Sequence, residues 1–248
     1  MEARTIPIAN RTVWIFDLDN TLYPATASLF PQIERRMREF VADQFDLSQE
    51  DAHRLQKKYY HEFGTTLRGL MTVHQLDPKP FLDYVHDIDS DCIVANPRLE
   101  TALRTLPGRK IVFTNGTRDH AHRILGKLGI GHLFDAVYDI GDAGYVPKPD
   151  PAPYEDLIRT YGIDPHQAVM IEDTCVNLEI ASRLGMATVW VHPPRHLKDQ
   201  YLKGDKPLDE SAPPSYVDYT VTDLTDWLEN LTKDMNRLSD AACDMPER

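Results

Sequence analysis

Short apolar runs alternate with segments of helical spacing along most of the chain, and this alternation limits the folds that it can adopt. The runs are too short for helices and are rich in β-branched and aromatic residues, which is typical of buried strands. We expect strands at residues 12–16, 110–113, 136–140, 168–171, 187–191 and 219–221. We expect helices near residues 97–106, 118–128, 151–161 and 176–184, with a last one reaching Leu231. Strands alternating with helices predict a parallel, doubly wound α/β sheet.

The segment after the first expected strand has a different character, since it contains no convincing strand. Between residues 28 and 87, apolar residues recur every three or four positions, which places them on one face of each helix. Ser48 resembles a helix cap, Thr65 offers another, and Pro78 opens a fourth helix. The sequence therefore predicts a core of residues 1–22 and 92–232, an all-helical cap of residues 23–91, and a C-terminal tail of residues 233–248.

The charge balance excludes several classes of function. Asp and Glu number 39 against 27 for Lys and Arg, a formal net charge of −12. Such a chain is poorly suited to bind nucleic acid or an anionic membrane. No apolar run approaches the ~20 residues of a transmembrane helix, and residues 1–10 lack the apolar core of a signal peptide. With only three cysteines, these features predict a cytoplasmic protein.

Polar residues suited to phosphate chemistry follow four of the expected strands. They are Asp17 and Asp19, then Thr114 and Asn115, then Lys148, and then Glu172 and Asp173. Ligands of parallel α/β sheets bind at the carboxyl ends of the strands. Carboxylates suit Mg²⁺, an ammonium group neutralises phosphate oxygens, and a carboxylate can attack phosphorus as a nucleophile. The sequence therefore predicts phosphoryl transfer with Mg²⁺ at this edge of the sheet.

In this order, the four groups resemble the four motifs of the haloacid dehalogenase superfamily. The resemblance extends over about residues 13–231 and implies a Rossmann-like core with a cap. It implies that Asp17 is the nucleophile that forms a phospho-aspartate. It also implies that Asp19 first protonates the leaving oxygen and then activates water.

The same resemblance implies how the phosphoryl group and the metal are bound. Thr114 and the backbone amide of Asn115 would bind the phosphoryl group, while Lys148 would hold both the phosphate and the nucleophile. The ligands of Mg²⁺ would be the carboxylates of Asp17 and Asp173 and the main-chain carbonyl of Asp19.

Two further residues are expected near this metal site, outside its direct ligands. Glu172 would lie just outside the metal ligands. Asn177 would either reach the metal through water or serve only as a first-turn helix residue, and the sequence does not separate these alternatives.

Three segments are similar to the pyrimidine 5′-nucleotidase branch of the superfamily, at residues 16–24, 64–70 and 172–178. This similarity implies hydrolysis of UMP or CMP to nucleoside and phosphate. Within the cap segment, the groups that can read a polar base or ribose are on Thr65, Thr66 and Arg68. The alternative is an ordinary helix start, with Thr65 as cap and Arg68 in solvent.

Other functions stay open at this stage. A different small phosphomonoester, such as phosphoglycolate, would suit the same core, and a sugar-phosphate mutase would also keep Asp19. A dehalogenase would not need that second acid. A non-catalytic binding module would tolerate the loss of a motif, but all four are present. The ten histidines show no metal-protease spacing, and His120 and His122 are expected on different faces of a helix.

Overall fold

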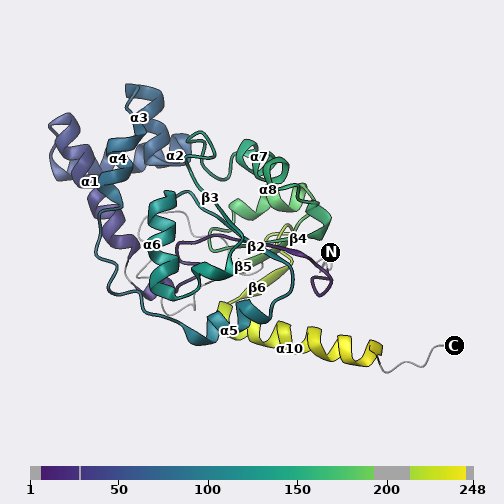
Figure 1. The fold of residues 1–248 in the computed structure, drawn as a ribbon. Coiled ribbons are helices and arrows are strands. Elements are labelled where there is room, and N and C mark those ends of the chain that lie inside the picture. The colour runs from purple at the N-terminus through teal and green to yellow at the C-terminus, as the bar shows by residue number, and fades with distance from the viewer. Residues whose placement is uncertain (1–6, 28, 193–212, 244–248) are drawn as a thin grey trace.

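A parallel sheet of six strands forms the centre of the computed structural model, which describes residues 7–27, 29–192 and 213–243. The strand order is β3-β2-β1-β4-β5-β6, and the expected doubly wound α/β core is confirmed (Figure 1). The strands are β1 (Val13–Phe16), β2 (Arg109–Phe113), β3 (Ala136–Tyr138), β4 (Ala168–Glu172), β5 (Ala187–Val191) and β6 (Tyr219–Val221).

Strand β1 lies between β2 and β4, and this position explains why it is apolar throughout. Its side chains alternate between the two faces of the sheet. Trp14 and Phe16 belong to one buried cluster, and Val13 and Ile15 belong to another. The chain order of the strands reverses at β1, and ligands of doubly wound sheets bind at such a point.

Helices of the core cover both faces of the sheet. Those that pack in the cluster of Trp14 are α5 (Pro97–Thr105), α6 (Arg118–Leu128) and α10 (Leu224–Cys243). Those that pack in the cluster of Ile15 are α7 (Pro151–Tyr161) and α8 (Asn177–Arg183). Short 3-10 turns occur at η1 (Ala25–Ala27), η2 (Gly131–Leu133) and η3 (Pro165–Gln167).

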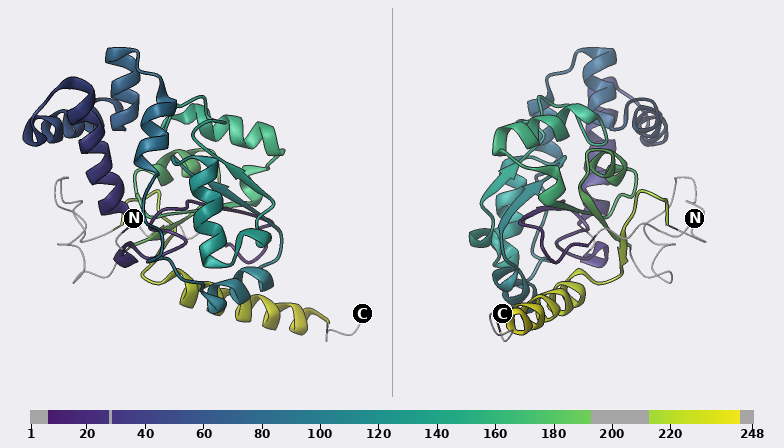
Figure 2. Two further views of the ribbon diagram at one scale, coloured as in Figure 1. Left: turned by 60° about the vertical axis from the view of Figure 1, so that its left-hand side comes forward. Right: turned by 90° about the vertical axis from the view of Figure 1, so that its right-hand side faces the viewer.

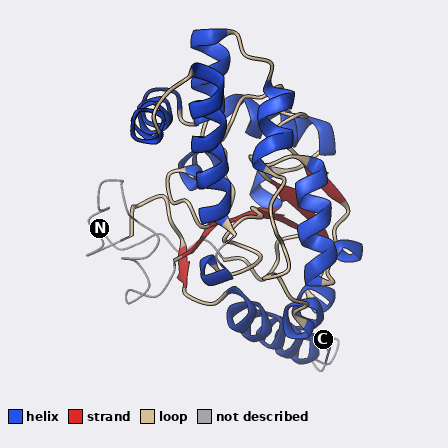
Figure 3. Cartoon of the chain, turned by 90° about the vertical axis from the view of Figure 1, so that its left-hand side faces the viewer, coloured by secondary structure: helices blue, strands red, loops and turns tan. Residues whose placement is uncertain are grey.

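Four helices between β1 and α5 form the cap. They are α1 (Phe30–Phe45), α2 (Gln49–Phe63), α3 (Thr66–His74) and α4 (Pro78–Val85), and they stand as a separate group beside the sheet (Figure 1). In the view from that side, helices lie in front of the strands (Figure 3). Ser48 and Thr65 accept hydrogen bonds from backbone amides as helix caps, as predicted. The cap has its own apolar cluster, which includes Leu70 and Phe81 and also Ile140 of the core. The exact bounds of 23–91 for the cap stay a prediction.

The C-terminal helix corrects one expectation. The tail expected from residue 233 instead continues α10 to Cys243, along the side of the core away from the cap (Figure 2). No Gly or Pro interrupts residues 224–243, and Leu228 and Thr232 are buried. No helix in the described ranges, including α10 with its 20 residues, is both long and apolar enough to cross a membrane. The loop expected at residues 196–215 lies largely outside those ranges.

Candidate active site

A buried lysine joins three segments of the core at the carboxyl ends of the strands. Lys148 Nζ lies 2.7 Å from Asp17 Oδ1 and 2.7 Å from Glu172 Oε2. It also donates a hydrogen bond to the main-chain oxygen of Phe113 at 2.9 Å. Asp17 follows β1, Glu172 ends β4, and Lys148 comes from the loop after β3. The structure therefore brings together residues that the sequence placed at the same edge of the sheet.

The side chain of Asn115 holds the loop that carries this lysine. Its Oδ1 accepts a hydrogen bond from the backbone N–H of Lys148 at 2.8 Å, and its Nδ2 donates to the main-chain oxygen of Lys148 at 3.4 Å. Sequence reasoning assigned only the backbone amide of Asn115, for phosphate binding. The structure adds a role for the side chain, which ties the end of β2 to the loop after β3.

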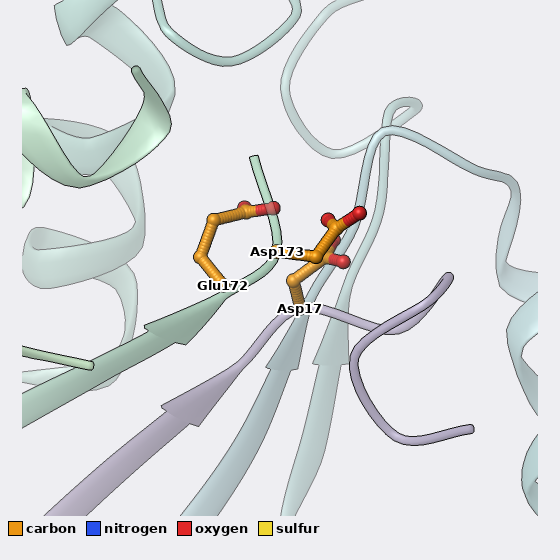
Figure 4. Close-up of side chains that lie close together, drawn as sticks. All are labelled: Asp17, Glu172 and Asp173. Atoms are coloured by element: carbon orange, nitrogen blue, oxygen red, sulfur yellow. The ribbon is translucent and has the colours of Figure 1, made fainter. Parts of the chain in front are cut away.

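Three carboxylates gather at the ends of β1 and β4 (Figure 4). Oxygen atoms of Asp17, Glu172 and Asp173 lie within 4.8 Å of one another. Burial, helped by the charge of Glu172 and opposed by Lys148, raises the pKa of Asp17 to about 7. Burial and the negative charges of Glu172 and Asp17 also raise the pKa of Asp173. Crowded oxygen ligands with an excess of negative charge fit a hard divalent cation such as Mg²⁺.

Protein groups donate hydrogen bonds to the acids of this cluster. Glu172 Oε2 is bound by Lys148, and its Oε1 accepts the backbone N–H of Thr174 at 3.1 Å. Both oxygens of Glu172 are therefore engaged by protein groups. Asp17 is engaged in the same way, because its Oδ1 accepts from Lys148 and its Oδ2 accepts the Thr21 hydroxyl at 3.2 Å. The assignment of Asp17 and Asp173 as the metal ligands stays a prediction.

Asp19 is held by two side chains that the sequence did not point to. Its Oδ1 accepts a hydrogen bond from the hydroxyl of Tyr23 at 2.6 Å and lies 2.9 Å from His120 Nε2. Burial by itself raises the pKa of Asp19, but His120 and Tyr23 outweigh burial and lower the pKa to about 2. Asn20 follows with a φ of 60°, a left-handed conformation that asparagine tolerates.

His120 is the functional candidate that sequence reasoning missed. It lies in the first turn of α6, three residues after the cap residue Thr117. That turn follows β2 at the same edge of the sheet as the four motifs. Its position just beyond Thr114 and Asn115 is the signal that would have identified it. The sequence analysis tested the histidines only for metal-ligand spacing, which does not detect such a residue.

Thr114 and Asp19 both lie next to Gly116, and phosphate binding by Thr114 stays a prediction. The Thr114 hydroxyl is buried and accepts the backbone N–H of Gly116 at 2.9 Å. A Cβ on Gly116 would lie 3.3 Å from Thr114 Oγ1 and 3.7 Å from Asp19 Oδ2, so these two oxygens converge there. Asn177 is buried at the start of α8, where its main-chain oxygen accepts the Tyr154 hydroxyl at 2.7 Å. Its expected contact with a metal through water stays a prediction.

The cap contributes Arg68 to a cavity next to the lysine. This cavity of about 260 Å³ is lined by Phe63, Gly64 and Arg68 from the cap and by residues 146–150 of the core, which include Lys148. The Thr65 hydroxyl caps α3, and the buried Thr66 hydroxyl donates to the main-chain oxygen of Gln56 at 3.4 Å. Of the three cap residues singled out in the sequence, Arg68 is therefore the one that lines this cavity.

Comparisons with known proteins agree with this geometry. A family model described as haloacid dehalogenase-like hydrolase matches residues 12–185, and one described as HAD hydrolase-like matches residues 145–227. Phosphate metabolism protein 8 of Saccharomyces cerevisiae is 29% identical over 201 residues. The match covers 74% of this chain but 62% of the yeast protein, so the chain spans less than two thirds of that relative.

A second relative matches along almost its full length. Glyceraldehyde 3-phosphate phosphatase of Methanopyrus kandleri is 26% identical over 235 residues, which are 89% of this chain and 98% of that protein. Among solved structures, a HAD phosphatase from Thermococcus onnurineus superimposes with a TM-score of 0.56 and 19% identity. The superposition covers 89% of this chain and 97% of the other, and at this identity it supports the fold alone.

Proposed function

Because the chain belongs to the haloacid dehalogenase-like hydrolase family, we propose that it is a Mg²⁺-dependent phosphomonoester hydrolase whose nucleophile is Asp17. The observation that carries this proposal is the buried group of Lys148, Asp17 and Glu172, with Asp173 beside it, at the carboxyl ends of β1 and β4. Full-length relatives that are named as phosphatases support the same class of reaction.

The side chains of the site divide the proposed reaction into two steps. In the first, a carboxylate oxygen of Asp17 attacks phosphorus, the bond to the leaving oxygen breaks, and Asp19 donates a proton to that oxygen. The negative charge of the bound phosphate favours the protonated form of Asp19 before this step. In the second, Asp19 takes a proton from water, the water oxygen attacks phosphorus, and the bond from phosphorus to Asp17 breaks, which releases phosphate and restores the Asp17 carboxylate.

Charge is the main difficulty of this reaction, because an anionic nucleophile must approach an anionic phosphate. Lys148 holds Asp17 and offsets part of this repulsion, and we expect Thr114 and the backbone amide of Asn115 to bind phosphate oxygens. Mg²⁺ held by Asp17, Asp173 and the main-chain carbonyl of Asp19 would supply further positive charge.

For the substrate, we propose a pyrimidine nucleoside monophosphate. The cavity beside Lys148 contains an aromatic ring, from Phe63, and a guanidinium group, from Arg68. A ring can pack on a base, and a guanidinium can donate hydrogen bonds to the carbonyl oxygens of a pyrimidine. The second candidate is a three-carbon phosphate, which the name of the Methanopyrus relative favours.

A panel of phosphomonoesters tests both parts of the proposal. We expect purified protein to release phosphate from UMP or CMP with a kcat/KM at least about tenfold above that for glyceraldehyde 3-phosphate or phosphoglycolate, a gap of about 1.4 kcal/mol. Chelation should stop the reaction and Mg²⁺ should restore it. A preference for three-carbon phosphates would overturn the proposed substrate but would agree with the proposed reaction. Isomerisation of a sugar phosphate without phosphate release, or full activity in excess chelator, would overturn the reaction itself.

A further inference from the structure

The second acid of the site is held against a histidine that is completely buried. His120 has no exposed surface, and its Nε2 lies 2.9 Å from Asp19 Oδ1. Its other ring nitrogen, Nδ1, is buried without a hydrogen-bond partner among the residues that the structure describes. A proton on Nδ1 would leave a buried N–H unpaired and would turn the lone pair of Nε2 toward the carboxylate. The favourable neutral form therefore carries its proton on Nε2 and donates it to Asp19.

A second histidine ring packs on the face of the His120 ring. His86, at the end of the cap helix α4, stacks on it with 4.6 Å between ring centroids and 19° between planes. His86 Nδ1 lies 3.3 Å from the hydroxyl of Thr117, the residue that caps α6. Arg123 of α6 donates a further hydrogen bond to the main-chain oxygen of His86. A side chain packed and bonded in this way has little freedom to rotate.

Both hydrogen bonds to Asp19 reach the same oxygen. His120 and Tyr23 occupy Oδ1, so Oδ2 is the atom left for proton transfer. Oδ2 is also the atom that converges with Thr114 Oγ1 beside Gly116, where we expect the phosphoryl group.

We propose that His120 is a positioning residue, which holds Oδ1 of Asp19 so that Oδ2 faces the leaving oxygen of the substrate. This inference rests on the proposed function, because it requires Asp19 to be the general acid. It adds a residue outside the four motifs, together with the hydrogen bond and the ring stack through which that residue acts.

A general acid matters most when the leaving group is a poor one. p-Nitrophenolate leaves readily as an anion, phenolate less so, and the alkoxide of benzyl alcohol needs a proton most. The ratio kcat/KM reports the steps up to loss of the leaving group, so the later use of Asp19 as a base does not enter it. The hydrolysis of p-nitrophenyl, phenyl and benzyl phosphates therefore isolates the step in which we expect His120 to act.

Two substitutions separate the hydrogen bond from the packing. His120→Phe keeps a ring against His86 but removes the donor, whereas His120→Gln keeps an N–H near the position of Nε2. For benzyl phosphate, we expect His120→Phe to lower kcat/KM about 10- to 100-fold, with little loss for p-nitrophenyl phosphate. His120→Gln should recover most of the lost rate. His122→Phe, at an exposed position on the same helix, is the matched control and should change none of the three rates.

The possible results distinguish this inference from the function on which it rests. Equal losses for all three substrates, or losses in His120→Gln as large as in His120→Phe, would mean that His120 only packs, and would overturn the inference. If Asp19→Asn leaves the dependence on leaving group unchanged, the proposed acid itself is wrong. Should His120→Phe not fold, His120→Met replaces it, since methionine fills apolar gaps and offers no N–H.

Discussion

The ammonium group of Lys148 lies 2.7 Å from the carboxylate of Asp17, and both side chains are almost wholly buried. The same ammonium group also lies 2.7 Å from Glu172, so one positive charge serves two acids before Asp173 is counted. Buried charges are stable only when they are paired or bind a metal. The carboxylates of this cluster therefore affect cation binding, folding stability and reactivity together.

Loss of the lysine charge should damage both folding and catalysis. We expect Lys148→Met to lower the free energy of unfolding by about 3–5 kcal/mol, because it leaves buried acids without a partner. Denaturant titration measures this change, and turnover should fall along with it. The double variant Lys148→Met with Glu172→Gln should regain part of the stability but none of the activity. Unchanged stability in the single variant would contradict a buried ion pair.

Replacing the nucleophile should separate activity from stability. We expect Asp17→Asn to reduce turnover by a factor on the order of 10⁴ to 10⁶, because an amide cannot attack phosphorus in place of the carboxylate. The substitution is nearly isosteric and removes one of three crowded acids. Without metal at pH 8, its melting temperature should therefore equal or exceed that of the wild type. Substantial turnover in pure Asp17→Asn protein would refute the assignment of Asp17.

The effect of Mg²⁺ on stability should grow with pH. In the folded, metal-free protein the pKa of Asp17 is raised from 3.8 to about 7, so the folded state binds more protons than the unfolded state between these values. Stability from this group is therefore present at low pH and lost as pH rises toward 7. Because Mg²⁺ competes with those protons, we expect it to raise the melting temperature more at pH 8 than at pH 6.

Two variants serve as controls for the Mg²⁺ measurement. Asp173→Asn should remove most of the shift in melting temperature, since it lacks a ligand carboxylate. Asp19→Asn should keep most of it, since its expected ligand is a main-chain carbonyl. An equal shift at pH 6 and pH 8 in the wild type would argue against metal binding by the acids with raised pKa values.

Substrate selectivity should depend on the cap. We expect Arg68→Ala to raise KM for UMP or CMP about 10- to 100-fold, the range for a lost hydrogen bond from a charged donor, and to leave p-nitrophenyl phosphate almost unaffected. Arg54→Ala, at an exposed position on α2, is the matched control. Equal losses for nucleotide and p-nitrophenyl phosphate would instead assign Arg68 to the phosphate site or to folding of the cap.

Most of the fold was predictable because its signals are local. The apolar run of β1 ends where Asp17 begins, and the expected bounds of α6 and α7 are those of the structure. The caps at Ser48 and Thr65 are also short-range features. The sequence did not reveal how far α10 continues, because it contains neither a stop signal nor a clear reason to continue beyond Leu231.

The missed part of the candidate site depends on contacts between distant segments. Asp19 and His120 are 101 residues apart, and they meet only because β1 pairs with β2 and α6 starts directly after β2. Helical spacing assigned His120 to one face of α6 but not to a partner. A threonine hydroxyl suits a helix cap and a ligand equally well, so the sequence alone did not separate these roles for Thr65 either.

The central place of β1 also affects how the chain folds while it is being made. Both partners of Ile15, which are Ile111 and Met170, come much later in the chain. At about 5–20 residues per second, roughly 8–30 seconds of translation separate Ile15 from Met170. Until β2 has been made, β1 is an apolar segment with neither of its neighbouring strands, whereas the cap helices form largely from local contacts. Translation intermediates that end before β2 are therefore expected to expose the apolar residues of β1, which favours aggregation.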